Sequence, residues 1–335
     1  MRPVLFEFGP LPWWALPLLV VVLAAFLGLW SWLERREEPR PWTSGDWLVW
    51  AASSLISAGI IFWLVNWHHA RTGQPVLIRA YGAMLLVGLV AGIAWAVYAG
   101  RPRGWGPTMM VDLALYLLVG GLLGARLIFV LLEPELFRAS PGSMLRVWEG
   151  GLSFHGGLLG GGVGAYLFAR IHRLSFLELA DFAMPSVALG YAFTRIGCFL
   201  NGCCFGGLCD SALGVRFAPG SEAAAWGLSL PPGQVATTWG PPMYPTQLLM
   251  SFLGFVIFVL LVSLARHFPR AGHLFIFSLA LFGAERFVAE FWRAGASARM
   301  FALIPALTEA QAFSLVMILF AVLYLVLARP RRAEG

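Results

Sequence analysis

Nine apolar runs, each about as long as a membrane-crossing helix, follow one another along the 335-residue chain. A helix rises about 1.5 Å per residue, so roughly 20 apolar residues cross the ~30 Å hydrocarbon core of a bilayer. The first run is too long for a cleavable signal peptide, so we expect it to be retained. The pattern predicts an all-α polytopic membrane protein with spans at 11–33, 47–66, 77–98, 110–132, 155–171, 177–199, 244–265, 272–292 and 309–328.

Composition supports this class, because 59% of the residues are hydrophobic and only 12% are charged, against about 25% in soluble domains. All 23 basic residues are arginine, and the net charge is +6. The arginines form no basic stripe, which argues against nucleic-acid binding. If the C-terminal tail is cytoplasmic, twelve arginines lie in cytoplasmic segments and eight in outer ones. Nine spans then put the N-terminus outside, and the small excess of cytoplasmic arginine weakly favours this orientation by the positive-inside rule.

The segment 200–243 is the longest connection between predicted spans and is rich in glycine and proline. It is predicted to be irregular and to act as a lid or a substrate-binding surface on the outer side. Four cysteines lie in or beside it with the spacing C-x4-C-C-x4-C, which is not a standard zinc pattern. We therefore expect no metal; a disulfide and small apolar packing stay open as roles for Cys198, Cys203, Cys204 and Cys209.

Three arginines, Arg126, Arg195 and Arg286, fall within predicted spans or at their ends. An ionised arginine at the bilayer centre costs at least ~2.5–3.5 kcal/mol, so such residues usually face a protein interior and have a partner or a function. Snorkelling to the interface is the alternative. Arg286 and Glu290 are four residues apart on one helix face and can pair, either as a structural element or as part of a site.

Arg195 precedes Asn201 and a glycine-rich turn at the end of its span. Guanidinium donors beside exposed N–H groups suit a phosphate, but a glycine-capped helix end with arginine on its last carbonyls is equally compatible. His155 begins a run whose glycines recur every four residues, a spacing that lets another helix approach closely. His155 could reach a ligand or be merely solvated. Tyr81 could belong to an interfacial aromatic belt, and Asp181 could cap its own helix.

Taken together, these stretches resemble the prolipoprotein diacylglyceryl transferase family over roughly residues 76–328. The most specific blocks are the His-Gly-Gly and Arg-Ile-Gly motifs, in a variant form that reads Gly-Cys-Phe-Leu-Asn-Gly-Cys-Cys-Phe-Gly. The matching segments, in the family's order and spacing, are 78–82, 124–126, 148–158, 181–182, 195–206, 244–248 and 286–291.

The resemblance implies a seven-span transferase domain at 76–335 with the outer-face loop 200–243, preceded by an extension at 1–75 with about two transmembrane helices. It implies a multi-pass protein of the bacterial inner membrane whose active site faces the periplasm. The implied reaction moves the diacylglyceryl group of phosphatidylglycerol, a membrane lipid, to the lipobox cysteine in a prolipoprotein signal peptide. Glycerol phosphate is released in this first step of lipoprotein maturation.

The family's chemistry also implies roles for individual residues. His155 is the expected base for the acceptor thiol, Arg195 and Arg286 are expected to hold the phosphate, and Glu290 to hold Arg286 in position. The resemblance implies neither a metal nor another cofactor. The remaining residues expected to bind phosphatidylglycerol are Tyr81, Asn201, Gly206 and Arg126.

The chain departs from the family pattern at several positions near these motifs. Cys198 stands in place of an asparagine, Cys203 in place of a glutamate, Leu249-Met250 in place of Tyr-Glu, and Phe282 in place of a tyrosine. These departures motivate an alternative, a transferase of the same fold with a different acceptor. A lipid or anion transporter that breaks no bond is a second alternative, and a non-catalytic membrane scaffold is a third.

Overall fold

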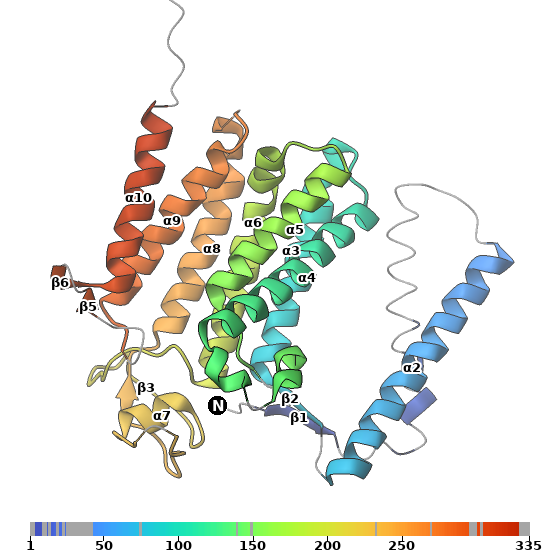
Figure 1. The fold of residues 1–335 in the computed structure, drawn as a ribbon, viewed down its shortest axis with the longest axis horizontal. Coiled ribbons are helices and arrows are strands. Elements are labelled where there is room, and N and C mark those ends of the chain that lie inside the picture. Colours follow the sequence, from blue (N-terminus) through green and yellow to red (C-terminus); the bar gives the residue numbers. More distant parts are fainter. Residues whose placement is uncertain are drawn as a thin grey trace, which may run out of the picture. The chain divides into compact units, whose positions relative to one another are not determined.

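The computed structural model describes residues 4–8, 12, 15–17, 20–21, 24, 43–73, 76–138, 140–147, 150–231, 233–268, 270–294, 300–301 and 304–327. Long helices dominate these residues, as the apolar runs predict (Figure 1). They are α2 (Ser44–Thr72), α3 (Ala80–Gly100), α4 (Pro107–Leu132), α5 (Phe154–Ile171), α6 (Phe176–Asn201), α8 (Thr246–Leu264), α9 (His273–Glu290) and α10 (Glu309–Leu327).

Each of these helices corresponds to one predicted span, whereas most of the predicted span 11–33 lies outside the described residues. Among the described residues, six helices are long and apolar enough to cross a membrane: α2, α3, α4, α6, α8 and α10. The glycines of α5 dilute its hydropathy, and α9 carries Glu285, Arg286 and Glu290. These features confirm the all-α polytopic class.

The prediction that a helix begins at residue 77 is wrong. Strand β2 (Val76–Arg79) pairs antiparallel with β1 (Val4–Phe8), and α3 begins only at Ala80. Both strands are short apolar runs rich in residues that favour strands, and such runs cannot be told from helix by hydrophobicity alone.

The chain divides into two compact units, Met1–Met84 and Leu85–Gly335. The first holds the β1–β2 pair and α2, whose start is fixed by a reciprocal capping box between Thr43 and Asp46. This division falls within α3, whereas the sequence predicts a boundary after residue 75.

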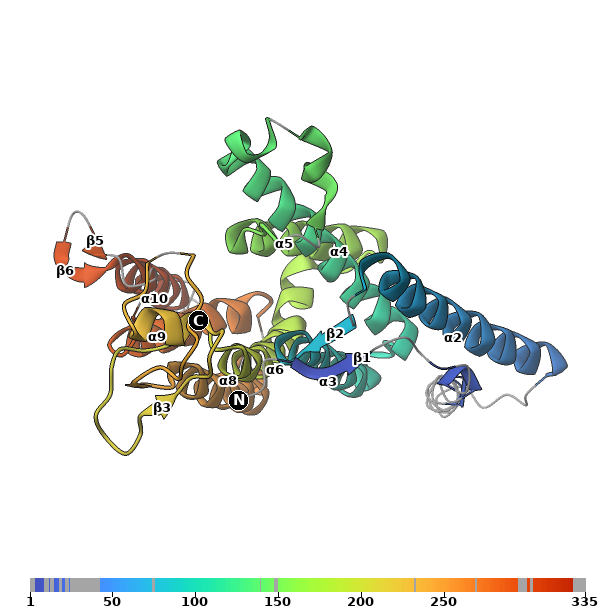
Figure 2. The same cartoon turned by 90° about the horizontal axis from the view of Figure 1, so that it is seen from below.

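In the second unit, α4 and α5 are packed backbone to backbone. A Cβ placed on Gly160 would overlap the carbonyl oxygen of Gly120, and one on Gly156 would overlap that of Gly124. The predicted close approach of a neighbouring helix is therefore confirmed, and its partner is α4. On another face, α6 packs against α8 and α9, and α10 packs against α9 (Figure 2).

The sequence suggests that Asp181 could cap its own helix, but the structure shows that it does not. It lies beyond the first turn of α6, and its carboxylate accepts the backbone N–H groups of Gly272 (2.7 Å) and Phe275 (2.6 Å) at the start of α9. Because α9 has no side-chain cap of its own, Asp181 supplies acceptors that the first turn needs. Asp181 thus fixes α9 against α6.

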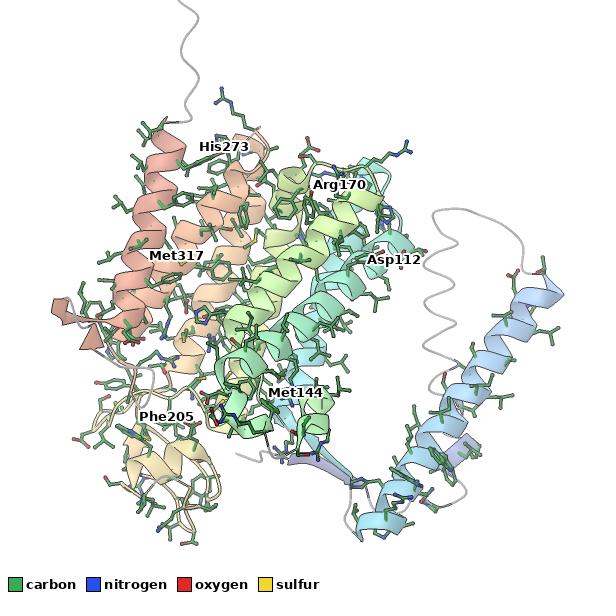
Figure 3. All side chains as sticks on the ribbon, viewed as in Figure 1. Asp112, Met144, Arg170, Phe205, His273 and Met317 are labelled. Carbon is green, nitrogen blue, oxygen red and sulfur yellow. The ribbon has the colours of Figure 1, made fainter. Side chains whose placement is uncertain are left out.

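Side chains at the two ends of the second unit separate clearly in Figure 3. Met144 and Phe205 lie at one end, and Asp112, Arg170 and His273 lie at the other. The connection after α6 belongs to the end with Phe205. It is not wholly irregular, because it contains α7 (Glu222–Gly227) and a two-residue pairing of β3 (Val215–Arg216) with β4 (Pro242–Met243).

Candidate active site

The last two turns of α6 carry Arg195 above an aromatic ring. Its guanidinium carbon lies 4.7 Å from the ring centroid of Tyr191, one turn earlier on the same face. The Tyr191 hydroxyl donates to Glu285 of α9 at 2.9 Å. The helix ends at Gly202, which adopts φ 71° and donates to the carbonyl oxygens of Cys198 and Phe199. The predicted glycine cap is therefore confirmed, while Arg195 points to the α9 side.

The last turns of α9 contain the predicted pair of Arg286 and Glu290. Arg286 Nη2 lies 2.9 Å from Glu290 Oε2, and the carboxylate side chain is fully shielded from solvent. Arg293 also approaches this carboxylate, with Nε at 3.7 Å. One buried carboxylate therefore serves two guanidinium groups, which orients both.

Arg195 of α6 and Arg286 of α9 share one electrostatic environment. The charges of Arg195, Arg286 and Arg293 all act on Glu285, and the charge of Arg195 also acts on Arg286. Three guanidinium groups thus stand against the carboxyl groups of Glu285 and Glu290, an excess of positive charge. Such a cluster is stabilised by a bound anion.

Two donors of this cluster remain without a hydrogen-bond partner in the part of the chain that the structure describes. They are Nε of Arg195 and Nη1 of Arg286, and both atoms are buried. The two carboxylate oxygens of Glu290 also lack a hydrogen bond there, although Arg286 Nη2 lies 2.9 Å from one of them. Buried donors are normally satisfied, so the two unpaired donors on neighbouring helices could donate to a further acceptor group. A phosphate has several acceptor oxygens and matches guanidinium donors.

The chain that follows α6 is clamped between two other segments. The backbone N–H of Gly206 donates to Tyr244 O at 3.0 Å, and that of Gly207 donates to Trp292 O at 2.9 Å. Thr246 Oγ1 donates to Cys204 O at 3.1 Å, and Gln247 Nε2 donates to Cys203 O at 2.8 Å. The Arg-Ile-Gly motif, the Tyr-Pro-Thr-Gln motif and the end of α9 therefore meet in space.

Gly206 has a packing reason to be glycine. A Cβ there would lie 2.5 Å from Trp292 O and 2.7 Å from Tyr244 O. These separations are too short for any side chain, so Gly206 permits three backbone segments to converge. Substrate contact by Gly206 stays a prediction.

Arg126 has a different environment from the other two membrane arginines. It is 8% exposed, and four of its N–H groups have acceptors on the backbone before α5. The distances are 2.5 Å to Ser143 O and 2.8 Å to Met144 O. Nη1 donates two further hydrogen bonds, to Gly150 O at 2.6 Å and to Gly151 O at 2.9 Å. The structure thus uses Arg126 to position the chain that leads into α5.

His155 is the second residue of α5, whose start is capped by Ser153 Oγ at 3.3 Å from Gly156 N. The imidazole is exposed, and its ring contacts Phe154 at 5.8 Å between centroids. Arg170, at the other end of α5, lies at the end of the unit opposite Phe205 in Figure 3, so the first turn of α5 lies at the end with Phe205. Among the described residues, no hydrogen bond joins it to Arg195 or Arg286.

The remaining predicted residues lie at helix ends. Asn201 is the last residue of α6 and interacts through its side chain with Cys203. Tyr81 is exposed in the first turn of α3 and belongs to the first unit. Trp148 and Glu149 of the matching segments lie outside the described residues. Direct contact of any of these residues with substrate stays a prediction.

Three of the cysteines come together at the end of α6. The sulfur atoms of Cys198, Cys203 and Cys204 all lie within 4.8 Å of one another, and none is in a disulfide. Hydrogen bonds from the other two thiols lower the pKa of Cys204. The positive charges of Arg195 and Arg293 lower this pKa further, while burial acts in the opposite direction.

Sequence reasoning missed three members of the charged cluster: Tyr191, Glu285 and Arg293. Helical spacing could have indicated them, because Tyr191 precedes Arg195 by four residues and Arg293 follows Glu290 by three. Glu285 stands next to Arg286 in the sequence, but its hydrogen-bond partner, Tyr191, lies on another helix, so no local spacing indicates it.

Comparison with known proteins identifies the family of the chain. Residues 69–327 match the family model described as prolipoprotein diacylglyceryl transferase. A protein of Xanthomonas euvesicatoria pv. vesicatoria named phosphatidylglycerol--prolipoprotein diacylglyceryl transferase is 35% identical over 270 residues, which are 77% of this chain and 89% of the relative. A protein of the same name from Clostridium tetani is 27% identical over 216 residues, 64% of this chain and 81% of the relative. The chain belongs to the prolipoprotein diacylglyceryl transferase family.

Proposed function

We propose that this protein transfers the diacylglyceryl group of phosphatidylglycerol to the lipobox cysteine of prolipoproteins. Membership of the family supports the reaction. The observation that carries the chemistry is the pair of buried, unpaired guanidinium donors on Arg195 and Arg286. A phosphodiester between these two residues satisfies both donors and neutralises the excess positive charge.

In the reaction, the acceptor sulfur attacks the glyceryl carbon that is bonded to a phosphate oxygen. A C–S bond forms, that C–O bond breaks, and glycerol phosphate leaves with the bonding electron pair. Negative charge grows on the leaving phosphate, so fixed guanidinium groups lower the barrier. We assign this role to Arg195 and Arg286, with Glu290 orienting Arg286 through the 2.9 Å pair.

The acceptor thiol must lose its proton, because the thiolate is the nucleophile. His155 is the proposed base, since histidine is the side chain that most often takes up a proton in catalysis and this one is exposed. Asn201 and Tyr81 are proposed to contact the lipid head group. Arg126 and Gly206 are proposed to act indirectly, by holding the backbone around the site.

We place the site at the periplasmic side of the inner membrane. The connections that join α3 to α4, α5 to α6, and α8 to α9 carry Arg101, Arg103, Arg173, Arg266 and Arg270. The positive-inside rule assigns this end to the cytoplasm. The segment after α6 lies at the opposite end, where a translocated signal peptide arrives.

A membrane assay with labelled phosphatidylglycerol and a lipobox peptide tests the proposal. The wild-type chain should yield a peptide thioether and an equal amount of glycerol phosphate, and His155→Asn should yield neither. Retention of full activity by both His155→Asn and Arg195→Ala would remove the proposed mechanism. Uptake of lipid without glycerol phosphate release would instead favour the transporter alternative.

The acceptor is the part of the function for which this chain offers an alternative. Leu249 and Met250 replace the family's Tyr-Glu, and Met250 is buried with its sulfur 3.6 Å from Arg293 Nη1. A group that could contact a polar acceptor is thus replaced by an apolar one. Complementation of a strain depleted of its own transferase separates the two acceptor hypotheses. Restored growth supports prolipoproteins as the acceptors. If the protein does not restore growth but transfers the diacylglyceryl group to a small thiol, another acceptor is supported.

A further inference from the structure

The end of α6 gathers three thiols from a sequence spacing that predicts no metal site. Cys198 belongs to the last turns of the helix, and Gly202 then reverses the chain in a left-handed conformation. The backbone N–H of Cys203 donates to Cys198 O at 3.1 Å, which closes the turn. Cys204 itself has φ 59°, a conformation that non-glycine residues rarely adopt. The turn returns both later thiols toward Cys198.

Contacts from α8 hold this unusual turn in place. Gln247 Nε2 donates to Cys203 O at 2.8 Å, and Thr246 Oγ1 donates to Cys204 O at 3.1 Å. The Gln247 and Thr246 side chains are themselves fully buried. The three sulfur atoms are therefore presented by a supported backbone and not by a free loop.

We propose that Cys198, Cys203 and Cys204 form a three-thiolate binding site for a thiophilic divalent ion of the Zn²⁺ class. Their sulfur atoms lie within 4.8 Å of one another. Zn–S bonds of about 2.3 Å hold ligand sulfurs roughly 3.8 Å apart, so small side-chain rotations suffice. A disulfide would use only two of the three thiols and requires an S–S distance of about 2.05 Å.

The surrounding charges favour such an ion despite its positive sign. Three thiolates and a divalent ion together carry one net negative charge, and Arg195 and Arg293 act on Cys204 from outside the trio. These guanidinium groups compensate the complex as outer partners. Zn²⁺ usually takes four ligands, so three protein sulfurs leave one position for water or an external ligand.

The site goes beyond the proposed transfer reaction and does not depend on it. Its immediate consequence is structural, because the ion would join the end of α6 to the segment that carries Gly206 and meets α9. Its test therefore measures metal binding and not activity.

Cobalt titration of the full chain tests the proposal, because Co²⁺ replaces Zn²⁺ and gives a thiolate-to-cobalt charge-transfer band. The purified chain in detergent is reduced, stripped with chelator and titrated with CoCl₂ without oxygen. We expect one equivalent to bind and Zn²⁺ to displace it. Cys198→Ser, Cys203→Ser and Cys204→Ser should each weaken binding more than ~10-fold, since loss of even an outer partner costs about that much.

Cys209→Ser is the matched control. Cys209 is buried in the same connection, but its sulfur lies 3.1 Å from Ser211 Oγ and outside the trio. This variant should bind Co²⁺ as the wild type does. The proposal is overturned if the fully reduced wild type shows no charge-transfer band, or if Cys209→Ser weakens binding as much as the trio variants. A native disulfide between two of the three cysteines in freshly isolated membranes would also overturn it.

Discussion

Arg126 on α4 and Arg286 on α9 are both charged side chains in helices, yet their donors have different partners. Arg126 gives four hydrogen bonds to backbone carbonyl oxygens before α5. Arg286 is paired with Glu290 on one side and keeps a buried Nη1 without an acceptor among the described residues. The difference teaches that burial alone does not identify a binding arginine. The buried donor without an acceptor is what supports the proposed role of Arg286 in phosphate binding.

The neighbourhoods of the two arginines extend the contrast. The α4–α5 region is closed by glycines whose backbones touch, which leaves no space for a ligand between the helices. The α6–α9 region contains three guanidinium groups, two carboxyl groups and unsatisfied donors. The first region packs two helices tightly, and the second has the charges and donors on which the proposed phosphate site rests.

The largest expected effect is on catalysis, from Arg286→Ala. Loss of a donor to the leaving phosphate should lower the transfer rate by roughly 10²–10³-fold, as removal of a comparable preorganised donor does. Initial rates in the peptide assay measure this. Arg138→Ala is the control, because Arg138 forms an exposed pair with Glu135 whose side chains are 74% and 66% exposed. Equal activity of Arg286→Ala and Arg138→Ala would contradict the proposed role of Arg286 in holding the leaving phosphate.

A smaller effect, on stability instead of chemistry, is expected from Arg126→Ala. The substitution removes four partly buried hydrogen bonds to the backbone before α5. Each contributes about 0.5–1.5 kcal/mol net, so a loss of stability of a few kcal/mol at most is expected. Thermal unfolding in detergent should show a lower midpoint, while the KM for phosphatidylglycerol of the remaining folded protein should be unchanged. A raised KM with an unchanged unfolding midpoint would show that Arg126 binds phosphatidylglycerol and does not mainly stabilise the fold.

The glycine contact of the scaffold region can be tested with a pair of neighbouring glycines. Gly160→Ala forces a Cβ into the Gly120 carbonyl and should destabilise the protein by about 1–3 kcal/mol, as overpacking does. Gly162→Ala adds a Cβ where no atom lies within 4 Å, so its unfolding midpoint should equal that of the wild type or lie slightly above it, because alanine favours helix over glycine. Similar midpoints for both variants would show that α4 and α5 are not in close contact.

The smallest expected effect comes from Tyr191→Phe, which keeps the ring under Arg195 and removes the hydroxyl that donates to Glu285 at 2.9 Å. Loss of one hydrogen bond of about 1 kcal/mol should slow transfer roughly fivefold. Tyr98→Phe, at a 63% exposed position, is the control. A rate unchanged in both variants would mean that this bond does not position Arg195.

The sequence predicted the helices well because apolar runs long enough to cross a bilayer leave little choice of structure. It also predicted the Arg286–Glu290 pair, since both residues lie on one helix face. The sequence could not predict contacts between distant segments. Asp181 accepts a hydrogen bond from the start of α9 instead of capping its own helix, and Glu285 of α9 accepts one from Tyr191 of α6. Residues 77–79 of β2 are predicted as helix because a short apolar run has no period that separates strand from helix.

The cysteine cluster is another feature that depends on contacts between segments far apart in the sequence. Their spacing excludes a standard zinc motif, yet the left-handed turns at Gly202 and Cys204 bring three sulfur atoms together. Backbone conformations of this kind are set by contacts with α8, which no local pattern reveals.

The central claim is that Arg195 and Arg286 hold the same phosphate, and a double-mutant cycle tests it most directly. Transfer rates are measured for Arg195→Ala, Arg286→Ala and the double variant, with unfolding midpoints of the same proteins as a reference for simple repulsion between the two charges. A shared phosphate predicts a double variant much less impaired than the product of the single losses, with a coupling energy above about 0.5 kcal/mol in transfer and not in unfolding. Losses in transfer that multiply independently would contradict the account.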